Sequence, residues 1–142
     1  MLSHEADARL SRGLNLLGLP EATATALRDY LDLLTQWNRA YNLTAIRDPD
    51  EMVTKHLLDS LAIHPHVTGS LADVGTGPGL PGIPLALALP ELRVSLIETA
   101  GKKARFLREA VRRLGLEARV RVHDARAQEV PEPGQHDCLA AR

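Results

Sequence analysis

The sequence is poor in several residue types whose scarcity limits what the protein can be. Cys138 is the single cysteine among 142 residues, which excludes a disulfide framework and fits a reducing compartment. Apolar stretches are short and interrupted by proline, so no membrane span is expected, and the N-terminal MLSHEADARL lacks the pattern of a secretory signal. We therefore expect a cytoplasmic protein that is not embedded in a membrane.

Recognisable catalytic groupings are also missing. No set of serine, histidine and acid, of cysteine and histidine, or of metal ligands stands out along the chain. His64 and His66 flank Pro65 without a neighbouring cysteine or acid, so we interpret them as surface residues rather than a metal pair. His56 is more typical of packing or capping, and Cys138 of a small buried residue in a strand. The residues alone therefore predict no metal and identify no catalytic side chain.

Apolar residues are plentiful by contrast. A hydrophobic share of 44% and a charged share of 25% describe an ordinary globular protein with enough apolar material for a core. The length corresponds to one domain, or to one domain with a small appendage. A change of pattern near Pro65 divides the chain into a helical segment, residues 1–66, and an α/β region, residues 67–142.

The N-terminal segment has the pattern of helices. Between residues 21 and 40 apolar residues recur at three- and four-residue steps, namely Leu27, Tyr30, Leu31, Leu34 and Trp37. This period predicts an amphipathic helix with Trp37 in the core. Asp48, Pro49 and Glu51 carry the start signals of a further helix, with Asp48 as the cap and Glu51 completing a capping box. We expect that helix to run until Pro65 stops it.

The α/β region alternates short β-like runs with helix-like runs. The expected strands are residues 71–75, 93–98, 119–124 and 137–141, and the longer helix spans residues 102–115 and ends at Gly115. This alternation predicts right-handed βαβ units in a Rossmann-like parallel sheet with helices on both faces. Four strands make about half of such a sheet, so we expect the chain to be truncated at its C-terminal side.

A loop rich in glycine and proline follows the first expected strand. Its glycines are Gly75, Gly77, Gly79 and Gly82, and its prolines are Pro78, Pro81 and Pro84. The stretch 77–82 matches the dinucleotide fingerprint G-x-G-x-x-G, and Glu98 lies 21 positions after Gly77, where an acid suits a ribose diol. A strand, a glycine loop and a helix in this order favour a nucleotide-like ligand, although a tight turn without a ligand gives the same pattern.

The prolines argue against a phosphate in that ligand. A pyrophosphate is bound by backbone N–H groups at the start of a helix, and Pro81 and Pro84 remove two of these donors. S-adenosylmethionine has a ribose and a methionine tail but no phosphate. Asp73 would receive its ammonium, directly or through water, and Glu98 would accept both ribose hydroxyls. We therefore predict S-adenosylmethionine as the cofactor.

The residues also resemble a known family. The stretch from Asp73 to Pro84 is similar to the first motif of the bacterial small-subunit ribosomal RNA guanine-N7 methyltransferases, also called glucose-inhibited division protein B. The resemblance extends to Trp37-Asn38, Asn42-Leu43-Thr44, His56-Leu57-Leu58-Asp59-Ser60-Leu61, Leu96-Ile97-Glu98-Thr99, Lys102-Lys103, Phe106-Leu107 and Arg126-Ala127-Gln128-Glu129. The family usually has aspartate and serine where this chain has Glu98-Thr99. It also continues beyond the arginine that ends this chain.

The resemblance implies further site residues. It places cofactor contacts at Gly75, Leu80, Ala127, Gln128 and Arg142, in addition to the predicted Asp73, Gly77 and Glu98. Asn38, Asn42 and Thr44 are either turn-forming residues or residues that approach the substrate, and both interpretations stay open.

The implied reaction is methyl transfer to N7 of a guanine in 16S ribosomal RNA. N7 has an in-plane lone pair and no proton, so the displacement needs no general base, in agreement with the missing catalytic groupings. A carboxylate or carbonyl near the product would stabilise its positive charge, and the sequence does not identify that group.

Charge distribution gives this RNA a candidate surface. Residues 101–126 hold nine of the 17 basic residues and only three acids, although the net charge is −1. Such an asymmetry marks either a surface for a polyanion or an ordinary solvated helix face. We predict RNA contacts at Lys102, Lys103, Arg105, Arg112 and Arg113. With 3% aromatic residues, base stacking has few platforms, so recognition of shape within the small ribosomal subunit is expected.

Two other functions compete with this prediction. A nicotinamide-dependent oxidoreductase is favoured by G-x-G-x-x-G and Glu98 but opposed by the prolines. A non-catalytic RNA-binding or ribosome-assembly protein would use the basic surface alone. A monomer is the default expectation for any of the three.

Overall fold

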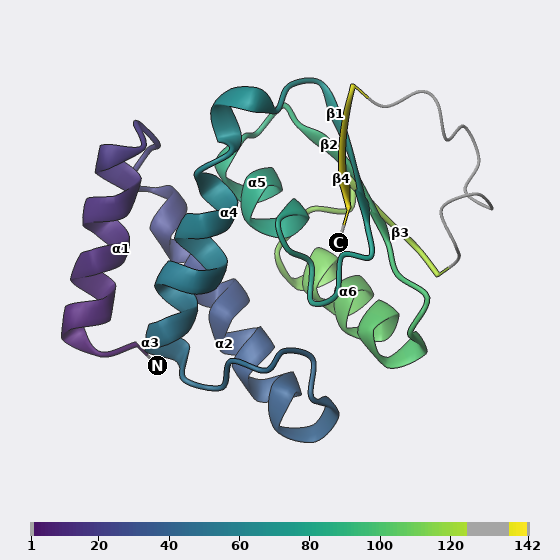
Figure 1. The fold of residues 1–142 in the computed structure, drawn as a ribbon, viewed down its shortest axis with the longest axis horizontal. Coiled ribbons are helices and arrows are strands. Elements are labelled where there is room, and N and C mark those ends of the chain that lie inside the picture. The colour runs from purple at the N-terminus through teal and green to yellow at the C-terminus, as the bar shows by residue number, and fades with distance from the viewer. Residues whose placement is uncertain (1, 125–136, 142) are drawn as a thin grey trace.

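The structure, a computed structural model, describes residues 2–124 and 137–141 (Figure 1). The helices are α1 (His4–Leu16), α2 (Thr23–Tyr41), α3 (Pro49–Met52), α4 (Asp59–Leu61), α5 (Gly82–Ala88) and α6 (Gly101–Arg113). The strands are β1 (Ser70–Val74), β2 (Arg93–Ile97), β3 (Val120–His123) and β4 (Cys138–Ala141). Each strand agrees within one or two residues with its prediction from the sequence.

The four strands form one parallel sheet in the order β3-β2-β1-β4, which confirms the predicted Rossmann-like arrangement. In this register Asp73 of β1 lies opposite Leu96 of β2. The carboxyl ends of parallel strands share one edge of a sheet, so the glycine loop after β1 and Glu98 after β2 emerge side by side. The fold thus brings together the two features that the sequence separates by 21 positions.

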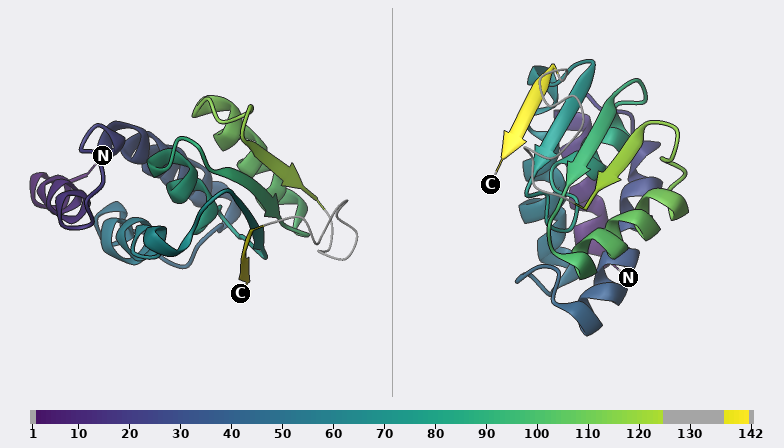
Figure 2. Two further views of the ribbon diagram at one scale, coloured as in Figure 1. Left: turned by 90° about the horizontal axis from the view of Figure 1, so that it is seen from above. Right: turned by 90° about the vertical axis from the view of Figure 1, so that its right-hand side faces the viewer.

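Among the described residues, helices cover one face of the sheet. In Figure 2 the four strands run in one direction, with α5 and α6 on the same side. Side chains alternate between the faces, and Leu71 and Leu96 point into the main core beneath these helices. The other face carries a small separate cluster around Ala72 and Ile97, and Leu139 is 73% exposed there. The second layer of helices that the sequence predicts does not lie in the described part of the chain.

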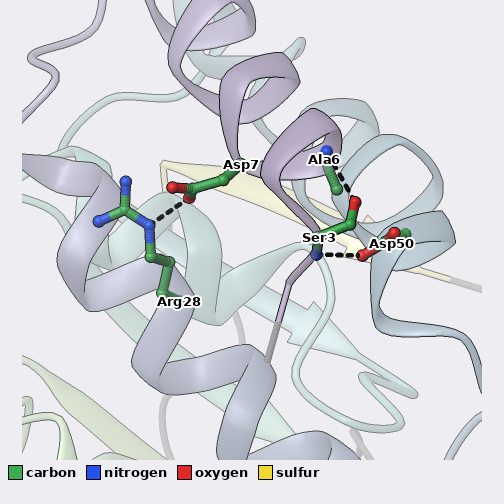
Figure 3. Close-up of polar contacts among 5 residues, drawn as sticks. All are labelled: Ser3, Ala6, Asp7, Arg28 and Asp50. Carbon is green, nitrogen blue, oxygen red and sulfur yellow. Dashed lines mark hydrogen bonds and ion pairs between the residues drawn. The ribbon is translucent and has the colours of Figure 1, made fainter.

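The helix α1 is fastened to the rest of the N-terminal segment by polar contacts near its start (Figure 3). The Ser3 hydroxyl accepts a hydrogen bond from Ala6 N–H (3.1 Å), and the Ser3 N–H donates to Asp50 Oδ1 (3.0 Å). Arg28 of α2 pairs with Asp7 at 2.5 Å. The hydroxyl and backbone N–H of Ser3 lower the pKa of the Asp50 carboxyl. This stabilisation therefore holds above the ordinary pKa and is lost as the pH falls through the lowered value.

The helical run after residue 48 begins at the predicted cap but ends differently, and the capping-box contact of Glu51 stays a prediction. Asp48 caps it by accepting a hydrogen bond from Asp50 N–H (3.0 Å). The run passes through α3, a π-helical stretch (Val53–Leu58) and α4, which ends at Leu61. Pro65 instead lies in a separate 3-10 turn (His64–His66), where its fixed φ is compatible with the backbone. The prediction that Pro65 stops the helix is therefore wrong, because the helix has already ended.

One hydrophobic core joins the helical segment to the sheet. The predicted face of α2 is buried at Leu27, Tyr30, Leu31 and Leu34, and Trp37 is half-buried against Phe106 of α6. The boundary between residues 66 and 67 therefore separates helices from the α/β part without separating two cores. Whether the two parts are distinct domains stays a prediction. No helix in the described part is long and apolar enough to cross a membrane.

The end of α6 confirms a signal read from the sequence. Gly115 has φ +69°, its N–H donates to Arg112 O (3.3 Å), and Leu116 N–H reaches back to Val111 O (2.9 Å). This pair of bonds is the Schellman arrangement, which favours glycine at the left-handed position.

Arg119, one of the nine basic residues between positions 101 and 126, binds the end of α5. Its guanidinium donates to three carbonyl oxygens, those of Ala86 (3.0 Å), Leu89 (3.1 Å) and Leu92 (2.8 Å). A cation at the C-terminal end of a helix also interacts favourably with the helix dipole. Arg119 therefore stabilises the packing of α5 and does not belong to a surface for a polyanion.

We expect Arg119→Met to lower the free energy of unfolding by about 2 kcal/mol, because several carbonyls lose a charged donor. Urea denaturation measures this change. Arg121→Met is the matched control, since Arg121 lies two residues further along the chain, in β3, and is exposed; its expected change is within about 0.5 kcal/mol. Equal changes in the two variants would contradict the role given to Arg119.

Candidate functional site

The glycine loop links the carboxyl end of β1 to α5 through a backbone that favours glycine. Gly77 has φ +61° and is half-buried. Apart from Gly77 and its two chain neighbours, no heavy atom of the described residues lies within 4 Å of the position that a Cβ on Gly77 would take. The loop therefore leaves open space at Gly77, where a ligand can approach the backbone closely.

Glu98 lies beside this space and holds the loop in shape. Its Oε1 accepts a hydrogen bond from Gly77 N–H (2.8 Å), and its Oε2 accepts from Ala100 N–H (3.0 Å). The side chain is 8% exposed. A carboxylate oxygen accepts more than one hydrogen bond, so these contacts leave capacity for hydroxyl donors of a ligand. The structure thus unites Gly77 and Glu98 at one open position, as the sequence predicts.

Asp73 lies beneath the loop rather than at its entrance. The residue is fully buried, and its Oδ2 accepts hydrogen bonds from the Thr76 hydroxyl (2.7 Å) and from Gly82 N–H (2.9 Å). The prediction placed Asp73 where it would receive a ligand's ammonium. In the structure its position in β1 directs the side chain to the face covered by α5, where it ties the two ends of the loop together. A direct contact with a ligand would require the loop to move.

Gly82 and Leu80 also serve packing. A Cβ on Gly82 would lie 2.5 Å from Leu96 Cδ2, so the start of α5 approaches β2 as closely as only glycine permits. Leu80 is fully buried, and its N–H donates to Thr76 O (3.1 Å). The cofactor contact predicted at Leu80 therefore stays a prediction, on a side chain that the structure places in the core.

The start of α5 has no amide available for a phosphate. Gly82 N–H is bonded to Asp73, Ile83 N–H is bonded to Gly79 O (2.7 Å), and Pro84 has no N–H. Of the two prolines predicted to remove donors, only Pro84 lies in the first turn, since Pro81 precedes it, and the protein itself bonds the other two amides that a pyrophosphate would need.

Tyr30 is a loop contact that sequence reasoning missed. It lies on α2, is fully buried, and its hydroxyl donates to Pro78 O at 2.7 Å. The helical periodicity identified Tyr30 only as an apolar core residue. A signal was nevertheless present, because a tyrosine on a face of leucines needs a partner for its hydroxyl.

Asn38, Thr44 and His56 form a local cluster at the end of α2. Asn38 Oδ1 accepts from Thr44 N–H (3.0 Å), and the Thr44 hydroxyl lies 2.9 Å from His56 Nε2. Asn42 takes the left-handed conformation that ends the helix. Asn38 is 2% and His56 8% exposed. The turn-forming interpretation describes these contacts, and His56 packs as predicted.

Two of the basic residues predicted to contact RNA, Arg112 and Arg113, line different hollows. Lys102, Lys103, Arg105, Arg112 and Arg113 all lie on α6. Arg113 lines a hollow of about 310 Å³ together with Asp29 and Asp32 of α2. Arg112 lines a different groove, next to β3. Of the other predicted site residues, Ala127, Gln128 and Arg142 lie outside the described residues.

Comparison with known proteins agrees with this geometry. A family model described as rRNA small subunit methyltransferase G (GidB) matches residues 23–142. The chain belongs to this family. The resemblance that the sequence motifs indicate is therefore confirmed.

Curated members of the family are close in sequence. Ribosomal RNA small subunit methyltransferase G of Stenotrophomonas maltophilia (strain K279a) is 62% identical over 136 residues, which are 95% of this chain and 64% of that protein. The protein of the same name from Xanthomonas euvesicatoria pv. vesicatoria (strain 85-10) is 56% identical over 142 residues, 99% of this chain and 66% of that protein. The chain thus spans 64–66% of the length of these relatives.

Solved structures show a more distant likeness. The S-adenosylmethionine-dependent methyltransferase SibL in its apo form has a TM-score of 0.48 and 22% identity, with 82% of this chain and 40% of that chain covered. StiE O-MT has a TM-score of 0.46 and 23% identity, with 76% and 31% covered.

Proposed function

We propose that the protein is an S-adenosylmethionine-dependent methyltransferase that methylates N7 of a guanine in the 16S RNA of the small ribosomal subunit. Membership of the rRNA small subunit methyltransferase G family supports this proposal. The observation that carries it is the pairing of Glu98 with Gly77 beside open space, at a loop whose following helix has no amide available for phosphate.

The residues present fit this cofactor. Glu98 offers carboxylate oxygens to the ribose hydroxyls, and the open backbone at Gly77, next to the exposed Gly75, leaves room for the methionine part. Both features suit a ligand that is rich in donors and has no phosphate. Asp73 acts through the loop that it holds. Leu80, Ala127, Gln128 and Arg142 remain further proposed contacts.

The cofactor supplies a methyl group on a positively charged sulfur. When bound, it would supply this methyl group to guanine N7, with the electron pair of the broken carbon–sulfur bond left on sulfur. No proton moves, so the protein's part is to hold the ribose at Glu98, to keep the loop rigid from Tyr30 and Asp73, and to exclude water. Catalysis by alignment requires no general base.

The decisive experiment incubates the protein with labelled S-adenosylmethionine and small ribosomal subunits that lack the modification. Label at guanine N7 supports the proposal, and label that never reaches this atom overturns it. Calorimetry with S-adenosylhomocysteine and with NAD tests the cofactor separately. Binding of NAD alone would favour the oxidoreductase, which the occupied amides of α5 oppose.

Tyr30→Phe offers a test of the loop contact. Losing the hydrogen bond to the buried Pro78 carbonyl loosens the loop by about 1 kcal/mol, so we expect S-adenosylhomocysteine to bind about fivefold more weakly. Isothermal titration calorimetry measures this change. Tyr41→Phe on the same helix is the matched control, because Tyr41 is 39% exposed, and its affinity is expected to stay unchanged.

We also propose that the protein acts as a monomer in the cytoplasm, with ribosomal RNA as its macromolecular partner. A reducing compartment fits the single cysteine. Light scattering of the purified protein measures its mass, and a dimer would contradict the first part of this proposal.

A further inference from the structure

A groove of about 500 Å³ runs between α6 and β3. Arg108 and Arg112 line it from the helix, and Arg121 and His123 line it from the strand. β3 is the outer strand of the sheet in the described part of the chain, so one of its edges has no neighbouring strand there. The groove is therefore bounded by an open strand edge on one side and a helix on the other.

Cations stand on both sides of this strand edge. Val120 and Val122 belong to the core or pack against it, on the side of α6. Because side chains alternate along a strand, Arg121 and His123 lie on the opposite side. Arg108 and Arg112 are roughly 6 Å apart along α6, and Arg121 and His123 are about as far apart along β3. A chain of negative charges lying along the edge can thus meet positive charge from both sides.

The charge of this groove is poorly compensated. Its lining contains one acid, Glu117, against three arginines. Arg112 is also paired with Glu109 on its own helix. Arg108 and Arg121 are exposed, and neither has an ion-pair partner among the described residues. The groove therefore keeps a net positive charge that a bound anion would neutralise.

Neighbouring arginines are used differently. Arg119, two residues before Arg121, is bonded to the carbonyls at the end of α5. Arg113, next to Arg112, lines the hollow that contains Asp29 and Asp32. Arg108 and Arg121, which have no ion-pair partner among the described residues, thus both line the groove at the edge of β3.

We infer that this groove binds the phosphodiester backbone of RNA, with Arg108, Arg112, Arg121 and His123 as the contacts. The inference rests on the proposed function in taking RNA as the substrate, and it gives that RNA a path along the edge of β3. Contacts to phosphates position a substrate without reading its sequence. Of these four residues, only Arg112 belongs to the set predicted from the sequence, and Arg113 is left out.

A membrane surface fits the groove less well. A protein that lies on a membrane inserts apolar side chains beside its cations. The large exposed hydrophobic residues in the described part are Leu16, Tyr41, Ile63 and Leu139, and none of them lines the groove. A concave surface with arginines on both sides is better suited to a strand of phosphates.

The test measures binding of a fluorescently labelled fragment of small-subunit ribosomal RNA by anisotropy over a series of salt concentrations. We expect the double variant Arg108→Ala/Arg121→Ala to bind at least about tenfold more weakly and to reduce the slope of log K against log salt by about 2. The matched control Arg12→Ala/Arg113→Ala removes the same charge from exposed positions elsewhere and is expected to stay within about twofold of the wild type.

Three results would overturn the inference: equal losses in both double variants, no loss in the groove variant, or no RNA binding by the wild type. If the groove variant instead loses binding to vesicles of anionic lipid and keeps its RNA binding, the inference is also overturned and the groove is assigned to a membrane. Circular dichroism and S-adenosylhomocysteine titration are expected to be unchanged in both variants. If the wild-type protein binds RNA through the groove but does not methylate ribosomal subunits, the proposed function is contradicted and this inference stands.

Discussion

We expect Asp73→Ala to lower the free energy of unfolding by about 3 kcal/mol and to abolish measurable binding of S-adenosylhomocysteine. The buried carboxylate accepts hydrogen bonds from the Thr76 hydroxyl and from Gly82 N–H. Each hydrogen bond to a charged group contributes roughly 1.5–3 kcal/mol, and the alanine leaves both buried donors without their acceptor. Both ends of the glycine loop would then lose their common anchor.

Asp73→Asn separates the anchor from the charge. The amide oxygen of asparagine still accepts a hydrogen bond, so we expect an intermediate loss of about 1–2 kcal/mol and a loop that still binds the ligand weakly. Urea denaturation and calorimetry on the two variants give the comparison. An alanine variant as stable as the wild type, or one with undiminished affinity, would show that Asp73 does not hold the loop.

The role of Asp73 marks the limit of what local sequence signals predict. Its place just before the glycines predicts correctly that it lies near the loop. Whether its side chain points to solvent or beneath α5 depends on which face of the sheet the helix covers, and that follows from the pairing of β1 with β2. The strand ends, the cap at Asp48 and the glycine at the end of α6 depend on neighbouring residues alone, and the predictions for them agree with the structure within one or two residues.

Long-range contacts explain the other differences. Tyr30 and Pro78 are 48 residues apart in sequence and 2.7 Å apart at their bonded atoms, so no local pattern links them. From the sequence alone Arg119 is one basic residue among several, and only the fold shows that carbonyls at the end of α5 surround its guanidinium. The separation of Arg112 from Arg113 was predictable, since successive residues of a helix point about 100° apart and a basic pair on a helix therefore faces two directions.

The glycine loop shows both kinds of inference in one feature. The prolines predict from the sequence that it does not bind phosphate, and the structure adds that Asp73 and Gly79 already occupy the amides of the next helical turn. What the sequence leaves open is how the loop keeps its shape. Three side chains from three elements do this: Tyr30 from α2, Asp73 from β1 and Glu98 after β2.

Glu98 is the one of these three that also borders the open space, and its replacement tests the proposed cofactor directly. We expect Glu98→Gln to bind S-adenosylhomocysteine about 30-fold more weakly. The ribose hydroxyls would lose a carboxylate acceptor, whose hydrogen bonds contribute about 2 kcal/mol. The amide keeps one oxygen for Gly77 N–H, so the free energy of unfolding should change by only about 1 kcal/mol.

The contrast between affinity and stability is what distinguishes a ligand contact from a loop anchor. Calorimetry and urea denaturation are run on Glu98→Gln and on the control Glu91→Gln. Glu91 is exposed, and its replacement removes the same charge, so we expect it to change neither the affinity nor the free energy of unfolding. If Glu98→Gln loses as much free energy of unfolding as Asp73→Ala does, but its folded form binds S-adenosylhomocysteine normally, Glu98 only anchors the loop. A selective loss of affinity instead assigns its free lone pairs to the ribose, since the bonds to Gly77 and Ala100 belong to the protein alone.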